Sequence, residues 1–210
     1  MSAATAAKPN DSETSRCLPR PRPYRSVLLG YSALPMIHRF EIQLADVDRG
    51  VYVDLDLRVA RHPSEDVPYL LTRVLALTLE HKEGLTFSKG LSEADEPALW
   101  LRTPDGRVLE WIEVGSPAPE RLHRASKHAE KVVVYCHRRP DLLRQRCAKE
   151  RVHKADEVRV VEVPSALLTA LERHLDRNNR WDVSVHEGRV TVVIGEDALE
   201  AVFEAAPLGP

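Results

Sequence analysis

The segment Trp111-Ile112-Glu113-Val114-Gly115-Ser116-Pro117 places a single carboxylate in an apolar run and is followed at once by a basic stretch. Aromatic and β-branched residues favour a strand here, and glycine followed soon by proline ends it. A lone carboxylate at a strand end, beside cationic side chains, can hold a divalent metal ion. Further acidic clusters lie upstream at 64–66 and 93–97. Three acidic points followed by a basic helix are typical of a phosphodiesterase site.

The pattern around this segment predicts an α/β protein. Apolar and polar residues alternate over 39–44 and over 51–59 with turn residues between, which is typical of a hairpin with one buried face. Ser64 is expected to cap a helix with one buried stripe that runs to about Glu80. The other expected strands are 99–102, 107–114, 132–135 and 157–163, with a hairpin over 181–194, and the other expected helices are 120–129, 140–149 and 164–176.

The first 35 residues differ from the rest of the chain. Alanine and serine dominate their start, and prolines then alternate with arginines, a composition that favours extended, unpacked backbone. We therefore expect residues 1–35 to be a disordered extension and residues 36–210 to be the folded domain. A translation start at Met36 is an alternative explanation of the extension.

Composition excludes several classes of protein. With 210 residues and 23.7 kDa, the chain suffices for one domain of ordinary size. Its 43% hydrophobic content, without an apolar run near the roughly 18 residues that span a bilayer, argues against a membrane protein. A net charge of −2 argues against a histone-like coat on nucleic acid but allows a local basic face. Three cysteines without paired spacing fit a reducing cytoplasm.

Several separate motifs follow one another along the chain: Arg61-His62-Pro63-Ser64-Glu65, Gly90-Leu91 followed by Asp95-Glu96-Pro97, and Trp111-Ile112-Glu113-Val114-Gly115 through Pro117 with Arg121. Together and in this order, they resemble the YaeQ family of bacterial proteins. The match runs from about Met36 to the C-terminus. The resemblance implies a single compact α/β domain, a mixed β-sheet flanked by helices that varies the PD-(D/E)XK restriction-endonuclease-like fold. It implies no established biochemical activity.

The related nucleases hold Mg²⁺ between strand carboxylates and use a strand lysine to assist the attacking water. The resemblance therefore implies Asp95 and Glu113 as metal ligands and Glu65 as a supporting acid from the first helix. The chain departs from the pattern at the lysine position, which Gly115 occupies. A cation from the basic helix would have to replace it, with Arg124 the best placed and Lys127 a less well directed alternative.

Each candidate also has a purely structural explanation. Glu65 is favourable at any helix N-terminus, and Asp95 suits a turn before proline. Arg121 and Arg124, the expected phosphate-binding residues, are equally compatible with a solvated helix face. Glu113 is harder to explain structurally, because an unpaired carboxylate between apolar residues is costly to bury.

These observations lead to a first hypothesis of a cytoplasmic, Mg²⁺-dependent nuclease-like protein that acts on nucleic-acid phosphodiesters. The alternative is a non-catalytic module that keeps the fold and binds nucleic acid or regulates, and a third hypothesis is a structural interaction domain. Convergence of Glu65, Asp95 and Glu113 in space would favour the enzyme, because a non-catalytic protein has no reason to crowd three carboxylates.

Overall fold

The alternating segments form the expected hairpin, in which β1 (Met36–Asp46) pairs antiparallel with β2 (Val51–Arg61). Phe40, Ile42 and Leu44 point to the core, and the residues between them face outward, as a period of two requires. The computed structural model describes residue 1, residues 36–88 and residues 95–209. The disorder expected over 2–35 and the Gly90-Leu91 motif therefore fall outside the described residues.

The strands of the described residues form two sheets, whereas the sequence led us to expect one. The first sheet has the order β10-β9-β8-β1-β2, and within it β1 lies parallel to β8 (Asn178–His186). The hairpin expected over 181–194 consists of β8 and β9 (Arg189–Ile194). A further strand that the sequence pattern did not reveal, β10 (Asp197–Val202), completes this sheet.

The second sheet has the order β11-β7-β6-β5-β4-β3. Its three central strands, β5, β6 and β7, are mutually parallel, and the outer strands are antiparallel to their neighbours. The strands of this sheet are β3 (Thr86–Phe87), β4 (Leu99–Arg102), β5 (Val108–Val114), β6 (Ala129–Cys136), β7 (Arg159–Glu162) and β11 (Glu204–Pro207). The carboxyl ends of β5 and β6 consequently meet at one edge of the sheet.

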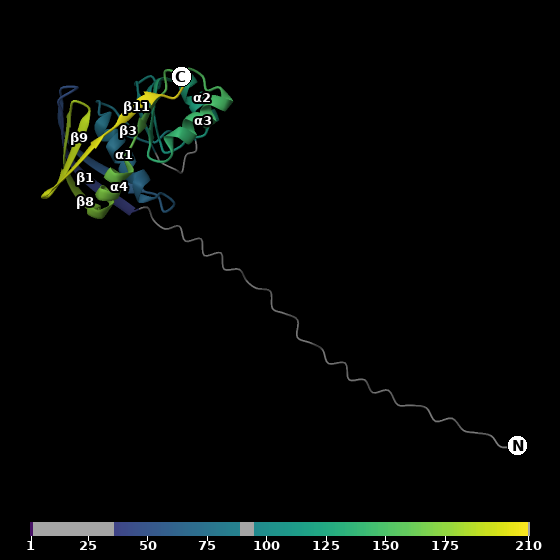
Figure 1. Cartoon of the computed structure of the whole chain (residues 1–210), viewed down its shortest axis with the longest axis horizontal. Coiled ribbons are helices and arrows are strands. Elements are labelled where there is room, and N and C mark those ends of the chain that lie inside the picture. The colour runs from purple at the N-terminus through teal and green to yellow at the C-terminus, as the bar shows by residue number, and fades with distance from the viewer. Residues whose placement is uncertain (2–35, 89–94, 210) are drawn as a thin grey trace. The chain divides into compact units, whose positions relative to one another are not determined.

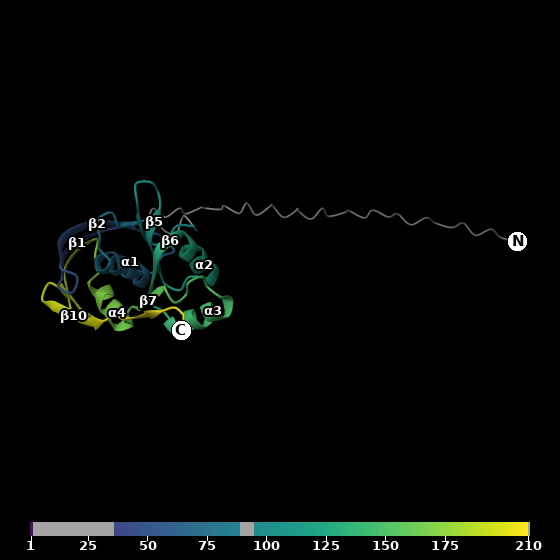
Figure 2. The same cartoon turned by 90° about the horizontal axis from the view of Figure 1, so that it is seen from above.

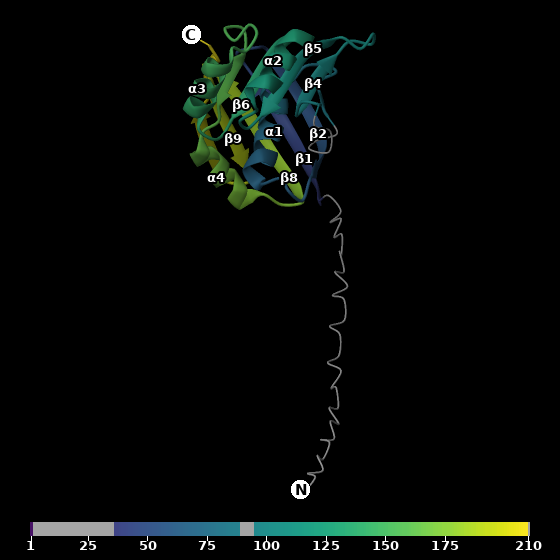
Figure 3. The same cartoon turned by 90° about the vertical axis from the view of Figure 1, so that its right-hand side faces the viewer.

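Helices fill the space between the sheets and cover the outer face of the second one (Figures 1 and 2). Between the sheets lie α1 (Val67–Leu79) and α4 (Ser165–His174), and their apolar residues join those of both sheets in one core. On the outer face lie α2 (Pro119–His128) and α3 (Pro140–Glu150), above a second apolar cluster. In Figure 3 these two helices lie on the side that faces the viewer, with α2 beside β6.

Two details of α1 differ from the sequence expectation. The helix is buried around most of its circumference rather than along one stripe, because it packs between two sheets, and even Arg73 is buried. Its N-cap is Asp66 instead of Ser64, and the Asp66 side chain accepts a hydrogen bond from the backbone N–H of Tyr69 at 2.8 Å. Glu65 therefore precedes the helix instead of lying in its first turn.

Candidate functional site

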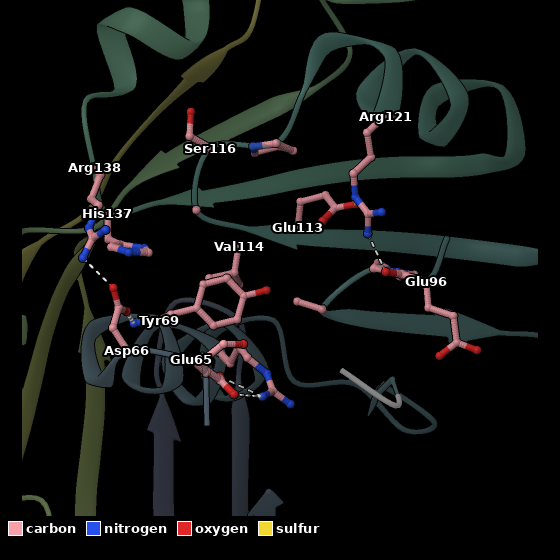
Figure 4. Close-up of a pocket in the computed structure, with 16 residues that line it drawn as sticks. Glu65, Asp66, Tyr69, Glu96, Glu113, Val114, Ser116, Arg121, His137 and Arg138 are labelled. Atoms are coloured by element: carbon pink, nitrogen blue, oxygen red, sulfur yellow. Dashed lines mark hydrogen bonds and ion pairs between the residues drawn. The ribbon is translucent and has the colours of Figure 1, made fainter. Parts of the chain in front are cut away.

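A pocket of about 440 Å³ opens at the edge of the second sheet where the parallel strands β5 and β6 end. This is the edge at which ligands usually bind in parallel sheets. Figure 4 shows its walls, which come from the start of α1, the end of β5 and the residues just after β6. Of the predicted site residues, Glu65, Glu113 and Arg121 line this pocket.

Glu113 is 4% exposed and lies on the pocket wall. Its Oε1 atom accepts two hydrogen bonds, from Trp111 Nε1 at 2.7 Å and from Arg121 Nε at 2.6 Å. Its Oε2 atom accepts none from the described residues. Burial raises the pKa of Glu113, and Arg121 and Trp111 offset only part of this rise. Glu113 therefore keeps one carboxylate oxygen open toward a ligand.

Glu65 is buried and fully engaged with its neighbours. Arg73 Nη1 donates to Glu65 Oε1 at 2.9 Å and to Oε2 at 3.2 Å, and the backbone N–H of His62 donates to Oε2 at 3.1 Å. The pair is almost completely shielded, with relative side-chain exposures of 6% for Arg73 and 1% for Glu65. Glu65 thus joins the end of β2 to the middle of α1.

Asp95 does not line the pocket that contains Glu65 and Glu113. Its side chain is 84% exposed and accepts a hydrogen bond from Arg124 Nη1 at 2.9 Å, beside a neighbouring smaller hollow that Arg121 also lines. Among the residues that the structure describes, no group of three or more His, Cys, Asp or Glu side chains is arranged to hold a metal ion. The three predicted acids therefore do not converge as expected of a three-carboxylate centre.

The three predicted cations, Arg121, Arg124 and Lys127, lie in three different surroundings. Arg121 lines the pocket and also donates to the backbone carbonyl of Glu96. Arg124 belongs to the neighbouring hollow, and Lys127 is exposed on α2 and lines neither. Of the basic helix, only Arg121 therefore enters the pocket.

Tyr69, His137 and Arg138 complete the pocket, and the sequence analysis missed all three. The Tyr69 ring lies between Glu65 and Glu113 in Figure 4. It packs edge-on against the His137 ring, with 6.3 Å between the two ring centroids. Burial raises the pKa of Tyr69, Arg73 opposes this rise, and the two glutamates add to it. His137 and Arg138 could have been foreseen, because they follow an apolar strand parallel to the one that ends in Val114.

His137 carries a buried Nδ1 atom without a hydrogen-bond partner in the described part of the chain. Burial lowers the pKa of His137, and Asp66 partly opposes this effect. Arg138 donates to Asp66 and keeps 64% of its side chain exposed at the pocket rim. The pocket therefore combines a neutral imidazole with an exposed guanidinium.

A second buried polar cluster, here called the Glu80 cluster, lies at the other end of α1 and was also missed. Tyr135 Oη donates to Glu80 Oε1 at 2.9 Å, Arg159 donates to the same oxygen, and Lys131 Nζ lies 3.4 Å from Oε2. Burial alone would raise the pKa of Glu80, but these three partners outweigh it and hold the pKa below its ordinary value. The side chains of this cluster satisfy one another.

None of the described helices is both long and apolar enough to cross a membrane. Among curated proteins, the uncharacterized protein YaeQ of Salmonella typhi is 37% identical over 101 residues, which cover 48% of this chain and 56% of that protein. The Escherichia coli (strain K12) protein of the same name is 36% identical over 99 residues, which cover 47% and 55%. The chain thus spans about half the length of the curated relatives it matches.

Solved structures extend the similarity over the folded unit. The YaeQ protein from Xanthomonas axonopodis pv. citri superposes with a TM-score of 0.75 at 31% identity, covering 82% of this chain and 99% of that one. The YaeQ protein from Pseudomonas syringae gives a TM-score of 0.75 at 34% identity, covering 81% and 95%. The model of the YaeQ protein family matches residues 32–203. This chain therefore belongs to the YaeQ family.

Proposed function

We propose that this protein binds nucleic acid at the pocket and its basic rim without hydrolysing it, on a fold related to the PD-(D/E)XK nucleases. One observation carries the proposal. Each of the three acids expected to serve a magnesium centre is bonded to an arginine, in the pairs Glu65–Arg73, Glu113–Arg121 and Asp95–Arg124. A cation already neutralises each carboxylate, and arginine does not give up its proton at ordinary pH.

The pairs leave donors free for phosphate. A guanidinium carries five N–H donors, and the described contacts of Arg124 and Arg138 each use only one of them. Both side chains are more than half exposed, Arg138 at the pocket rim and Arg124 beside the neighbouring hollow. Arginine forks bind phosphate oxygens in pairs, so the rim suits the backbone of a nucleic acid.

The backbone at position 115 supports a binding role over a catalytic one. Gly115 has φ of +91°, a conformation that strains any residue with a side chain. A lysine at the position used by the related nucleases would be strained there. The end of β5 therefore does not suit the lysine that assists the attacking water in the related nucleases.

A Mg²⁺-dependent nuclease is the second proposal. The Oε2 atom of Glu113 favours it, because a carboxylate oxygen that accepts no hydrogen bond from the described residues suits a hard cation. Asp95 fits the same ion poorly, since it is exposed and bonded to Arg124 outside the pocket.

Fluorescence anisotropy with labelled single- and double-stranded DNA and RNA, in EDTA, tests the first proposal. Wild-type protein should bind, and Arg138→Ala should reduce the slope of log affinity against log salt by about one unit. Arg173→Ala is the matched control, because Arg173 is an exposed arginine of α4 outside the pocket. Absence of binding at low salt would refute the proposal.

A cleavage assay with Mn²⁺ on the same substrates separates the two proposals. The binding module should leave every substrate intact. Cleavage by the wild type that is lost in Glu113→Gln, with binding retained, would establish the nuclease instead.

A further inference from the structure

The charges of this chain are strongly segregated along the sequence. Residues 119–154 contain 11 of the 30 Lys and Arg residues but only 4 of the 32 Asp and Glu residues, a net charge of +7. The rest of the chain contains 19 basic and 28 acidic residues, a net charge of −9. The overall charge of −2 therefore conceals a basic segment inside an acidic protein.

This segment forms a single layer of the fold. It contains α2, β6 and α3, and the two helices contact each other over the outer face of the second sheet (Figure 3). The middle of β6 is buried and apolar, and most of the charges lie on the helices and on the loops that follow β6 and α3. Lys131 differs, because it lies at the start of β6 and pairs with Glu80 at the end of α1, on the other side of the sheet. The basic residues of α2 and α3 lie on the outer side of the second sheet.

Five cations of this layer are exposed and form no ion pair with any described residue. They are Lys127, Arg139, Arg146, Lys149 and Arg151, and we call the surface that they form the α2–α3 face. Other basic residues of the layer are engaged with acids, such as Arg144 with Glu162 at 2.6 Å. The five cations therefore keep their full donor capacity for an external anion.

The backbone gives a second, independent indication. Four described residues other than glycine have positive φ, and three of them, Arg139, Arg151 and Lys154, lie in this layer. Their φ angles of 47°, 48° and 49° are in the left-handed region, where glycine and asparagine are favoured. Lys154 is paired with Glu157 at 2.8 Å, whereas Arg139 and Arg151 belong to the α2–α3 face. These two arginines thus occupy positions at which the local conformation favours other residues, as is common where a side chain serves a site.

We infer that the α2–α3 face binds the sugar-phosphate backbone of a nucleic acid, independently of base sequence. The inference deepens the proposed function, on which it rests, by naming the surface that holds the strand beside the pocket. The 11 residues of α3 extend for about 17 Å, or about five phosphate steps of one strand at 3.4 Å each.

A membrane surface fits this face less well than a nucleic acid. Helices that lie on membranes combine basic residues with a broad apolar face. Among the described residues, Leu142 is the only large apolar side chain exposed on the α2–α3 face, and it is 37% exposed. The face therefore offers charge without an apolar surface to insert.

The test compares full-length wild type with a triple variant that carries Lys127→Ala, Arg146→Ala and Lys149→Ala. Alanine has the highest helix propensity, and all three residues lie on helices, so the variant should fold. A matched control carries Arg173→Ala and Arg177→Ala, two exposed arginines outside this layer that form no ion pair with described residues. Thermal melting of all three proteins verifies that they are folded.

Anisotropy with a labelled duplex from about 50 to about 200 mM salt gives the readout. The triple variant should bind more weakly at low salt, and its slope of log affinity against log salt should fall by about two to three units, close to 0.9 for each lost phosphate contact. The control should keep the wild-type slope.

Other outcomes separate the inference from the proposed function. An unchanged slope in a folded triple variant would overturn the inference alone, while the pocket variant Arg138→Ala still tests the proposed function. Wild type that binds vesicles containing phosphatidylserine, but no nucleic acid, would assign the face to a membrane and overturn both. No binding of nucleic acid by the wild type at any salt would also overturn both.

Discussion

Replacing Arg73 with methionine should destabilise the protein strongly, because it leaves a buried carboxylate without its cation. Arg73 Nη1 contacts both oxygens of Glu65, at 2.9 and 3.2 Å, and only the backbone N–H of His62 would remain as a donor. Removing one partner of a buried pair costs about 3–5 kcal/mol. The melting temperature should fall by about 6–20 °C, at about 2–4 °C per kcal/mol for a folded unit of this size.

The double variant Glu65→Gln with Arg73→Met is the matched control. It removes both charges, so most of the lost stability should return, and a double-mutant cycle in a scanning calorimeter measures the coupling. A loss of no more than about 1 kcal/mol in Arg73→Met would refute the reasoning, because it is the value of a solvent-exposed pair. The double variant also tests whether the role of Glu65 is structural. If it is, the double variant should keep its affinity for nucleic acid, measured by fluorescence anisotropy.

Two further predictions concern the other buried acids. Burial raises the pKa of Glu113, so the folded protein holds that proton more tightly than the unfolded chain, and the stability that it contributes is lost as pH rises through the raised pKa. As the pH rises from about 4.5 toward neutrality, the unfolding free energy of wild type should therefore fall relative to that of Glu113→Gln. Urea titrations at several pH values measure this difference, and a difference that stays constant with pH would contradict the prediction. Tyr135→Phe should cost about 1.5–3 kcal/mol, because the lost hydrogen bond is to a charged carboxylate. Tyr52→Phe, at an exposed site, should cost almost nothing in the same titrations.

The sequence predicted individual elements well and their assembly less well. Alternation and helical spacing are local signals, so the hairpin of β1 and β2 and the four helices of the described residues were found within a few residues of their bounds. The division into two sheets depends on pairing between distant strands, such as Arg39 opposite Asn178, which no local pattern encodes. Strand β3 has only two residues, and β11 (EAAP) lacks the β-branched and aromatic residues that indicate a strand.

The candidate site shows the same limit. The sequence assigned Glu65, Glu113 and Arg121 to one site, and the structure brings them to one pocket. It assigned Asp95 to that site as well, but the side chain turns outward to Arg124. The buried arginine that engages Glu65, Arg73, lies inside an apolar helix, where a single charged residue gives no indication of its partner.

Isothermal titration calorimetry with Mn²⁺ tests most directly whether the acids are held by arginines instead of being free for a metal. Wild type, Glu113→Gln and Asp95→Asn should give the same small heats, without a saturating one-to-one isotherm, because a guanidinium already neutralises each carboxylate. A saturating site in the wild type that disappears in both variants would contradict this expectation and establish the metal centre.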